Sequence, residues 1–564
     1  MIASLPPGWI LLLGGLLVPL VPRRARPAWL LVLPVVSGVH LWALAPAGLV
    51  TTSWLGLDLT PVRVDALSLP FGVVFHLATL LAAIFAIHVD DLVEQASALV
   101  YSGAGIAAVF AGDLLTLFVY WELTAVASAL LVWAGRTPQA YAAGLRYLVI
   151  QVASGALLLA GAVILWRQTG SLAFGAMDVG TLAGALVFVS FGIKCAFPLL
   201  HNWLQDAYPE STVTGTVFLS VFTTKLAVYA LARGFAGTDI LIGIGAAMTV
   251  FPVFFAVIEN DLRRVLSYSL TNQLGFMVVG IGVGTATAIN GTVAHAFSHI
   301  IYKALLFMSM GAVLYRTGTV KASELGGLYK SMPWTAAFCI VGAASISGFP
   351  LLSGFISKSL IVDAVAEGHY LVAWFALIFA SAGVFHHSGI KIPFFAFFAH
   401  DSGIRCREAP LNMLVAMGVS AAACILIGVA PGLLYRLMPF PVTFQPYTAS
   451  HVLAQTQLLF WAGLAFAWLL RTGLYPADMP SVNLDTDWVY RRLVPRVINA
   501  GMARWRSVRD VAAGYARRAG GPLARGVSLG VGPDSAAART WATGPAVMWV
   551  VFLLAVFLLA YFRN

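Results

Sequence analysis

The sequence predicts an all-α, polytopic membrane protein built as a bundle of about sixteen transmembrane helices. The chain of 564 residues is 60% hydrophobic and only 10% charged, whereas soluble domains carry about 25% charged residues. Its apolar runs are long enough to cross a bilayer, and basic residues alternate between the loops that separate them. These observations exclude a water-soluble core and favour helices embedded in lipid.

The apolar runs, divided at the polar loops, give the predicted spans. The first run is short for a span, and the twelfth is too long to be one straight helix. The start of the sequence, MIASLPPGWILLLGG, lacks the basic segment of a signal peptide, so the first helix is expected to be retained. The predicted spans are 8–21, 27–46, 65–88, 96–112, 113–134, 142–166, 180–200, 211–233, 239–258, 262–284, 288–316, 333–364, 369–398, 410–432, 451–471 and 545–561.

Basic residues are concentrated in the odd-numbered loops between these spans. The even-numbered loops carry little beyond Arg63, Arg167, Arg233 and Arg436. Because basic loops stay on the cytoplasmic side, the alternation predicts an N-terminus outside and odd-numbered loops in the cytoplasm. The basic residues of the odd-numbered loops are Arg23, Arg24, Arg26, Arg136, Arg263, Arg264, Arg316, Lys321, Lys330, Arg405 and Arg407, followed by a basic tail.

A short internal echo links two of the spans. The letters FPLL occur at 197–200, after Lys194, and again at 349–352, before Lys358. Each proline removes a helical hydrogen bond inside an apolar run and frees a carbonyl. The two spans are five apart and therefore cross in opposite directions. Paired interrupted helices in inverted halves of a membrane protein indicate a transport site.

Charged residues at membrane depth are costly, so each needs a reason. Glu122 lies near the centre of the fifth span, Lys194 just before the break in the seventh, and Lys225 deep in the eighth. The structural alternative for Glu122 is a carboxyl held neutral in the bundle, or one paired to a neighbouring helix only for assembly. For Lys194 the alternative is a side chain that extends to the membrane surface. That alternative is harder for Lys225.

Further titratable residues follow in the second half. His295, His299 and Lys303 recur every four residues and therefore share one face of the eleventh span. A lone buried histidine is usually a packed core residue, but two histidines and a lysine in one stripe indicate a hydrated, titratable track. Lys358 follows the second break. Lys391 lies about one turn after His386 and His387. This histidine pair faces the outer interface or a neighbouring chain, and whether either histidine is functional stays open.

These residue types fit proton movement. Burial favours the neutral form of a lysine, whereas a neighbouring carboxylate favours the charged form. A glutamate that moves towards or away from a lysine therefore switches the proton affinity of that lysine. Polar residues of the tenth span could hold waters between the stations, namely Ser267, Ser269, Thr271, Asn272 and Gln273.

No cofactor or metal site is indicated. The four cysteines, Cys195, Cys339, Cys406 and Cys424, form no CxxC pair or Cys/His cluster, so metal, haem and iron–sulfur sites are not expected. Without a nucleotide or flavin motif the chain performs no redox chemistry of its own. Most of the net charge of +10 lies between 491 and 539, which indicates anionic lipid on the cytoplasmic side and not nucleic acid.

The motifs carry a family resemblance over about 65–400. FVYWEL, FGIKCAFPLLHNWLQDAYPE, TTKLAVYALAR, ENDLRRVLSYSLTNQLGF, HAFSHIIYKALLF and SISGFPLLSGFISKSLIV resemble the antiporter-like membrane subunits of respiratory complex I and of Mrp-type multisubunit cation/proton antiporters. The HHSGIKIPFFAFFAHDSG region looks nearer to the D-type branch of the Mrp subunits. One departure is DAYPESTVT, where family members usually have a sequence such as DAHPAAPTP; it adds Glu210.

By this resemblance, Glu122 matches the fifth-helix glutamate and Lys194 its partner in the broken helix. Lys225 matches the lysine that passes protons towards the centre, and Lys303 and Lys358 match the central and exit-side lysines. His295, His299 and Lys391 are expected to be accessory. The resemblance implies two inverted five-helix repeats, which gives this expected division: 1–95 N-terminal helices, 96–233 first half-channel, 239–398 second half-channel, 410–471 peripheral helices, 485–540 basic amphipathic segment and 545–561 anchoring helix.

The resemblance implies membership of a multisubunit complex in the bacterial cytoplasmic (inner) membrane. The expected partners are the other subunits, the lipid bilayer, protons, and Na⁺ or another monovalent cation. Two alternatives stay open: the proton-pumping membrane subunit of a complex I-like or hydrogenase-like redox complex, and a proton-coupling subunit for bicarbonate uptake. In 485–540, an apolar stripe opposite arginines suits either a helix in the membrane interface or a basic linker bound to lipid.

Overall fold

The structure is a computed structural model that describes residues 5–45, 48–475, 479, 483–533, 535 and 543–562. These residues are nearly all helical, which confirms the predicted class. The described strands are β1 (Leu49–Trp54) and β2 (Leu57–Arg63), which form an antiparallel hairpin that is not among the predicted elements. The chain separates into two units, Met1–Asp485 and Thr486–Asn564.

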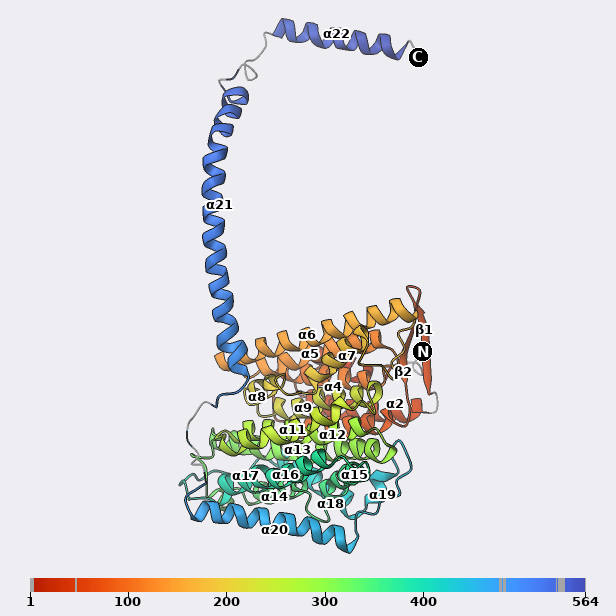
Figure 1. Ribbon diagram of the computed structural model, residues 1–564, viewed down its shortest axis with the longest axis vertical. Coiled ribbons are helices and arrows are strands. Elements are labelled where there is room, and N and C mark those ends of the chain that lie inside the picture. Colours follow the sequence, from red (N-terminus) through yellow and green to blue (C-terminus); the bar gives the residue numbers. More distant parts are fainter. Residues whose placement is uncertain are drawn as a thin grey trace. The chain divides into compact units, whose positions relative to one another are not determined.

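The first half of the larger unit combines long helices with the short helices α1, α8 and α9 (Figure 1). Side chains start several of them: Asp113 accepts a hydrogen bond from the Thr116 amide before α5, and Thr137 accepts one from the Ala140 amide before α6. The helices are α1 (Trp9–Leu17), α2 (Arg26–Leu44), α3 (Ser68–Ala86), α4 (Leu92–Val109), α5 (Leu114–Trp133), α6 (Pro138–Thr169), α7 (Leu182–Lys194), α8 (Asn202–Ala207), α9 (Gly215–Val221) and α10 (Thr223–Gly234).

The second half is longer and less regular. It contains π-helical turns, labelled η5 and η6, in the apolar run around Lys391. Its elements are α11 (Ile240–Ile258), α12 (Leu262–Val283), α13 (Ala286–Thr317), η4 (Leu328–Lys330), α14 (Pro333–Ser347), α15 (Ser353–Glu367), α16 (Leu371–Val384), η5 (Phe385–Ile390), α17 (Lys391–Pro393), η6 (Phe394–Phe398), α18 (Leu411–Val429), α19 (Pro431–Tyr435) and α20 (Ala449–Arg471).

The two FPLL copies break their helices with the same backbone geometry. The third residue of each copy is in the left-handed region, with φ of 70° at both Leu199 and Leu351. The residue before each copy is left-handed as well, with φ of 61° at Ala196 and 74° at Gly348. Left-handed backbone is costly for residues other than glycine. The echo in the sequence therefore corresponds to one repeated, strained turn.

The hydrogen bonds of the two turns match in the same way. The amide of Phe197 donates to the carbonyl of Gly192 at 3.0 Å, and the amide of Phe349 donates to the carbonyl of Ala344 at 3.0 Å. Both bonds span five residues, as at the end of a helix closed by a left-handed residue. The run 333–364 is accordingly two helices, α14 and α15.

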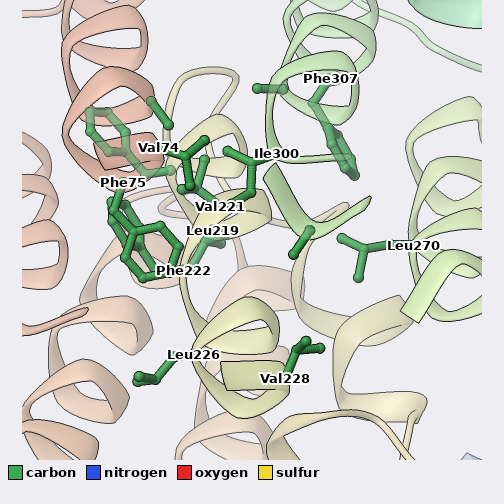
Figure 2. Packing of buried hydrophobic residues seen from close by; sticks show 14 of the residues in the cluster. Val74, Phe75, Leu219, Val221, Phe222, Leu226, Val228, Leu270, Ile300 and Phe307 are labelled. Carbon is green, nitrogen blue, oxygen red and sulfur yellow. The ribbon is translucent and has the colours of Figure 1, made fainter. Parts of the chain in front are cut away.

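The centre of the bundle is formed by helices that are buried on every side. Figure 2 shows residues of α3, α9, α10, α12 and α13 packed together, including Phe75, Leu226 and Ile300. The span Gly215–Gly234 is completely buried and Ala286–Thr317 almost completely, whereas α20 lies at the edge of the unit and is largely exposed (Figure 1). Lys225 and Lys303 therefore stand on the innermost helices.

The smaller unit contains η7 (Val489–Leu493), α21 (Val494–Val531) and α22 (Thr543–Tyr561). The last is long and apolar enough to cross a membrane. Part of the predicted segment 485–540, at 534 and 536–540, lies outside the described residues. Each of the sixteen predicted spans overlaps helix, and among the described residues twelve helices are long and apolar enough to cross a membrane, with shorter apolar helices beside them. The chain is a multi-pass membrane protein.

Candidate functional site

The predicted site residues lie inside the larger unit on six different helices, α5, α7, α10, α13, α15 and α17. Glu122 is half-buried and the others are buried. A buried charge is tolerated only when other groups or water stabilise it. The partners of each residue therefore decide what the arrangement can do. The residues are Glu122, Lys194, Lys225, His295, His299, Lys303, Lys358 and Lys391.

Lys194 is held against the turn of α5 that carries Glu122. Its ammonium donates to the carbonyl of Trp121 at 2.6 Å and to Thr124 Oγ1 at 3.0 Å. It also lies 4.4 Å from the centroid of the Trp121 ring, as in a cation–π contact. The Trp121 ring is itself fixed, because its indole N–H donates to Ser154 of α6 at 3.0 Å.

Glu122 is next to this ammonium but is not hydrogen-bonded to it. Its Oε1 atom is buried without a hydrogen-bond partner among the described residues. The two side chains are near enough for their charges to interact. Oε1 of Glu122 thus lacks a donor, while the ammonium of Lys194 is bound to the uncharged oxygens of Trp121 and Thr124.

Hydroxyl groups extend from this pair towards α10. Ser128 donates to the carbonyl of Thr124 at 2.5 Å and lies 2.8 Å from the Tyr147 hydroxyl. Tyr147 also faces Thr223, whose Oγ1 is 2.6 Å from the hydroxyl of Tyr101. Thr223 begins α10, two residues before Lys225. The sequence-based prediction missed Ser128, Tyr147 and Tyr101. Their partners lie on other helices, and the position of a hydroxyl within its own helix does not identify a partner on another one.

Lys225 binds at the junction of α9 and α10. Its ammonium donates to the carbonyl of Ser220 at 2.6 Å. The helix is interrupted at Phe222, with φ of −91° and ψ of −67°, and such an interruption leaves carbonyls available for another donor. Lys225 also lies within electrostatic range of Cys195, which directly follows Lys194. The eighth predicted span therefore contains a second, smaller interruption.

The stripe on α13 contains several unpaired buried polar atoms. His295 Nδ1 is 3.1 Å from Ser357 Oγ, and its Nε2 is 3.5 Å from the Tyr302 hydroxyl. Both ring nitrogens of His299 and the ammonium of Lys303 have no hydrogen-bond partner among the described residues. Buried polar groups of this kind are normally satisfied by ordered water.

His299 connects the two halves electrostatically. It lies within electrostatic range of Lys225 in the first half, of Lys303 on its own helix and of Lys358 in the second half. Lys303 interacts with the same two lysines. The structure thus brings Lys225, Lys303 and Lys358 together around α13, although 133 residues separate the first from the last.

Lys358 stands between the second break and a cavity. Its ammonium donates to the carbonyl of Ile346 at 2.8 Å, just before the break, and lies 5.2 Å from the Phe276 ring. The cavity has a volume of about 460 Å³ and is also lined by His451 and Gln455 of α20. His451 was not predicted, since it stands near the start of the fifteenth span, far from the motifs.

Lys391 has a different environment. Its ammonium donates to the carbonyls of Val257 and Glu259, at 2.7 Å each, at the end of α11. A lysine at this position stabilises a helix C-terminus. The neighbouring His387 lies 2.9 Å from Ser388 Oγ, which donates to Ser269 of α12 at 2.7 Å. Of the predicted pair, His387 therefore faces the polar side of α12.

Comparisons with known proteins agree with this architecture. Residues 111–400 match the family described as NADH:quinone oxidoreductase/Mrp antiporter, transmembrane. The chain is 35% identical over 311 residues to the D-type subunit of the Na(+)/H(+) antiporter of Alkalihalophilus pseudofirmus, covering 51% of this chain and 62% of the relative. It is 28% identical over 532 residues to the A-type subunit of the Na(+)/H(+) antiporter of the same organism, covering 83% and 66%. The chain thus spans less than two thirds of these relatives.

Solved structures share the fold. The Mrp complex from Dietzia sp. DQ12-45-1b contains a chain that matches with a TM-score of 0.70 at 21% identity, covering 82% of this chain and 99% of that one. The membrane-bound sulfane sulfur reductase, an archaeal respiratory membrane complex, matches with a TM-score of 0.71 at 23% identity, covering 98% and 99%. At these identities the likeness concerns the fold alone.

Proposed function

The chain belongs to the NADH:quinone oxidoreductase/Mrp antiporter family, and from this premise we propose that it is a proton-translocating, antiporter-like subunit of a multisubunit membrane complex. We propose further that the complex exchanges protons for Na⁺ or another monovalent cation. The likeness to two Na(+)/H(+) antiporter subunits supports this assignment. The observation that carries it is the row of buried bases through the centre of the bundle.

In this proposal Glu122 and Lys194 form the switch. While Lys194 is bound to the carbonyl of Trp121, its ammonium lacks an anionic partner. When the carboxylate of Glu122 approaches, it stabilises the protonated lysine, and when it withdraws, the lysine releases its proton. The hydroxyls of Thr124, Ser128 and Tyr147 offer the released proton a way towards α10.

Lys225 and Lys303 are the central relay, with His295 and His299 as accessory stations. Each step is an exchange between neighbouring basic groups through water, since Lys303 and His299 have no direct partner among the described residues. Repulsion between neighbouring positive charges disfavours simultaneous protonation of adjacent lysines. A proton arriving at one station therefore promotes release from the next.

Lys358 is the exit or entrance of the second half, because it combines a place beside the break with access to the cavity lined by His451. Lys391 is kept as an accessory residue. Its bonds to the end of α11 support a structural contribution besides any role in the path.

A second candidate is the proton-pumping membrane subunit of a redox complex. The fold match to the sulfane sulfur reductase chain, over 98% of this chain, favours keeping it. Both candidates use the same bases and differ in whether a cation gradient or electron transfer drives the protons. Imposing each driving force separately on the purified complex distinguishes them.

The test uses the complete complex in sealed vesicles with a pH-sensitive dye. We expect a Na⁺ gradient to drive proton movement in the wild type, and Glu122→Gln and Lys194→Met to abolish it. The matched control is the exposed pair Lys321 and Glu324, 3.1 Å apart, changed to Met and Gln. Wild-type rates in Glu122→Gln and Lys194→Met would rule out the switch.

A further inference from the structure

A buried acid from the end of the larger unit contacts the first helix break. Oδ2 of Asp485 accepts a hydrogen bond from the Tyr268 hydroxyl at 2.8 Å and lies 3.3 Å from His201 Nε2. The side chains of Asp485 and His201 are 5% and 2% exposed. His201 directly follows the first FPLL turn and precedes α8. Asp485 is therefore joined to the break and to α12 at once.

The hydrogen bonds determine the form of His201. An ionised Asp485 only accepts hydrogen bonds, and with Asp485 in that form the contact places the hydrogen of His201 on Nε2. His201 Nδ1 is then an acceptor, and it is buried without a partner among the described residues. The ring packs against Phe251, with 4.6 Å between centroids. The pair thus consists of an oriented imidazole with one nitrogen available for a proton and a carboxylate behind it.

Other charged groups surround this pair at the same end of the bundle. Asn483 donates to Glu259 Oε2 at 3.2 Å, and Lys391 donates to the Glu259 carbonyl. Glu259 and Arg264 lie within electrostatic range of Tyr268. Three loops meet here, the one with His201, the one with Glu259 and the segment that ends at Asp485. All three are odd-numbered loops, for which the charge pattern predicts the cytoplasmic side.

Polar side chains lead from the pair into the bundle. On α8, which begins after His201, Gln205 donates to Thr271 Oγ1 at 3.0 Å. Thr271 lies one turn beyond Tyr268 on α12 and is followed by Asn272 and Gln273. Those last two are linked, since Gln273 Nε2 donates to Asn272 Oδ1 at 2.5 Å.

The row then reaches the stripe on α13. The Tyr302 hydroxyl donates to Gln273 Oε1 at 3.3 Å and lies 3.5 Å from His295 Nε2. Hydrogen-bonding side chains of α8, α12 and α13 therefore lie between the pair at His201 and the predicted proton track. Lys194 and Glu122 take no part in these contacts.

We infer that His201 and Asp485 form a buried proton-exchange site beside the first helix break, at this end of the central track. His201 binds a proton at Nδ1 and passes it on, while Asp485 positions the ring and stabilises the imidazolium. The inference rests on the proposed proton translocation. In the lysine relay, Lys194 stands before the first break. The proposed site adds His201, which stands after it.

The test measures proton transport by the reconstituted complex as a function of pH. We expect His201→Gln to slow transport by about a hundredfold. Asp485→Asn keeps the size and the acceptor for Tyr268 but not the charge. It should therefore slow transport and move the pH-dependent limb towards lower pH by about one unit. Asp485→Glu keeps the negative charge and should therefore retain both the transport rate and the pH profile of the wild type.

Asn483→Ala is the matched control, since it removes only the contact with Glu259 and should leave the rate and the profile unchanged. Thermal unfolding and subunit stoichiometry check that each variant is assembled. Wild-type rates and profiles in His201→Gln and Asp485→Asn, with Glu122→Gln still inactive, would overturn this site and leave the proposed function standing. If His201→Gln fails to assemble, the profile of Asp485→Asn alone decides.

Discussion

Gly155 of α6 makes the space in which the carboxylate of Glu122 lies. A methyl group added at Gly155 would come within 1.4 Å of Glu122 Oε1. The position of the acid is therefore set by a missing side chain on the neighbouring helix, as well as by its own rotamer. Because Lys194 binds the adjacent carbonyl of Trp121, any displacement of Glu122 also changes its distance to the ammonium.

Gly155→Ala should consequently impair transport while the fold is kept. The alanine methyl group and Oε1 cannot share this space, so the flexible Glu122 side chain must turn its carboxylate away. We expect proton transport in vesicles to fall well below the wild type. Gly243→Ala in α11, where the new methyl group meets nothing within 4 Å, is the control. Normal transport in Gly155→Ala would mean that the position of Glu122 is not critical.

Lys303→Met should separate function from stability. The ammonium of Lys303 is buried and has no hydrogen-bond partner among the described residues. Burying an unpaired charge is costly, so an apolar side chain of similar length should not destabilise the fold at this position. We expect an unchanged or higher melting temperature together with loss of proton transport. A large fall in melting temperature would show that Lys303 has a structural partner.

Tyr147→Phe should slow transport without preventing assembly. The variant removes the hydroxyl that lies 2.8 Å from Ser128 and faces Thr223, but keeps the ring against Trp203. Ser128 retains its bond to the Thr124 carbonyl, so a stability loss of only about 1 kcal/mol is expected. The control is Tyr141→Phe on the same helix, whose ring is exposed. Equal transport in both variants would exclude the hydroxyl path.

The sequence predicted the fold well because its signals are local. Span length, loop charge and the two prolines are all read within one stretch of chain, and the structure places helix at every predicted span. Pairing is not local. Gly155 is 33 residues from Glu122, and Asp485 is 284 residues from His201. The spacing of these residues in the sequence does not identify their partners. The space that Gly155 leaves for Glu122 and the contact of Asp485 with His201 can therefore be found only in the structure.

The repeated turn illustrates the same limit. The letters FPLL predict a break, but not that Leu199 and Leu351 adopt the left-handed conformation. The β-hairpin lies in a polar loop whose alternation is too short to predict strands. The hydroxyl row also combines Ser128, Tyr147 and Thr223, from three helices whose faces the sequence leaves open.

Asp65 gives a stability change in acid that is independent of transport. It lies at the first position of the predicted span 65–88 but before α3 (Ser68–Ala86), the helix that can cross the membrane. Arg233 Nη2 donates to it at 2.8 Å and Arg63 Nε at 2.9 Å. Burial by itself would raise the pKa of Asp65, but the hydrogen bond and charge of Arg233, with Ser68 and Arg63, outweigh burial and lower it to about 2.

Because the folded pKa of Asp65 lies below its ordinary value of 3.8, the carboxylate stabilises the fold fully above about pH 4. That contribution, on the order of 2 kcal/mol, is lost as the pH falls towards 2. Asp65→Asn should therefore lower the melting temperature in detergent at neutral pH. The difference from the wild type should shrink between pH 4 and pH 2, while Asp58→Asn, on the exposed hairpin, should show little difference at any pH. A gap that stays constant with pH would show that Asp65 acts by packing and not through its charge.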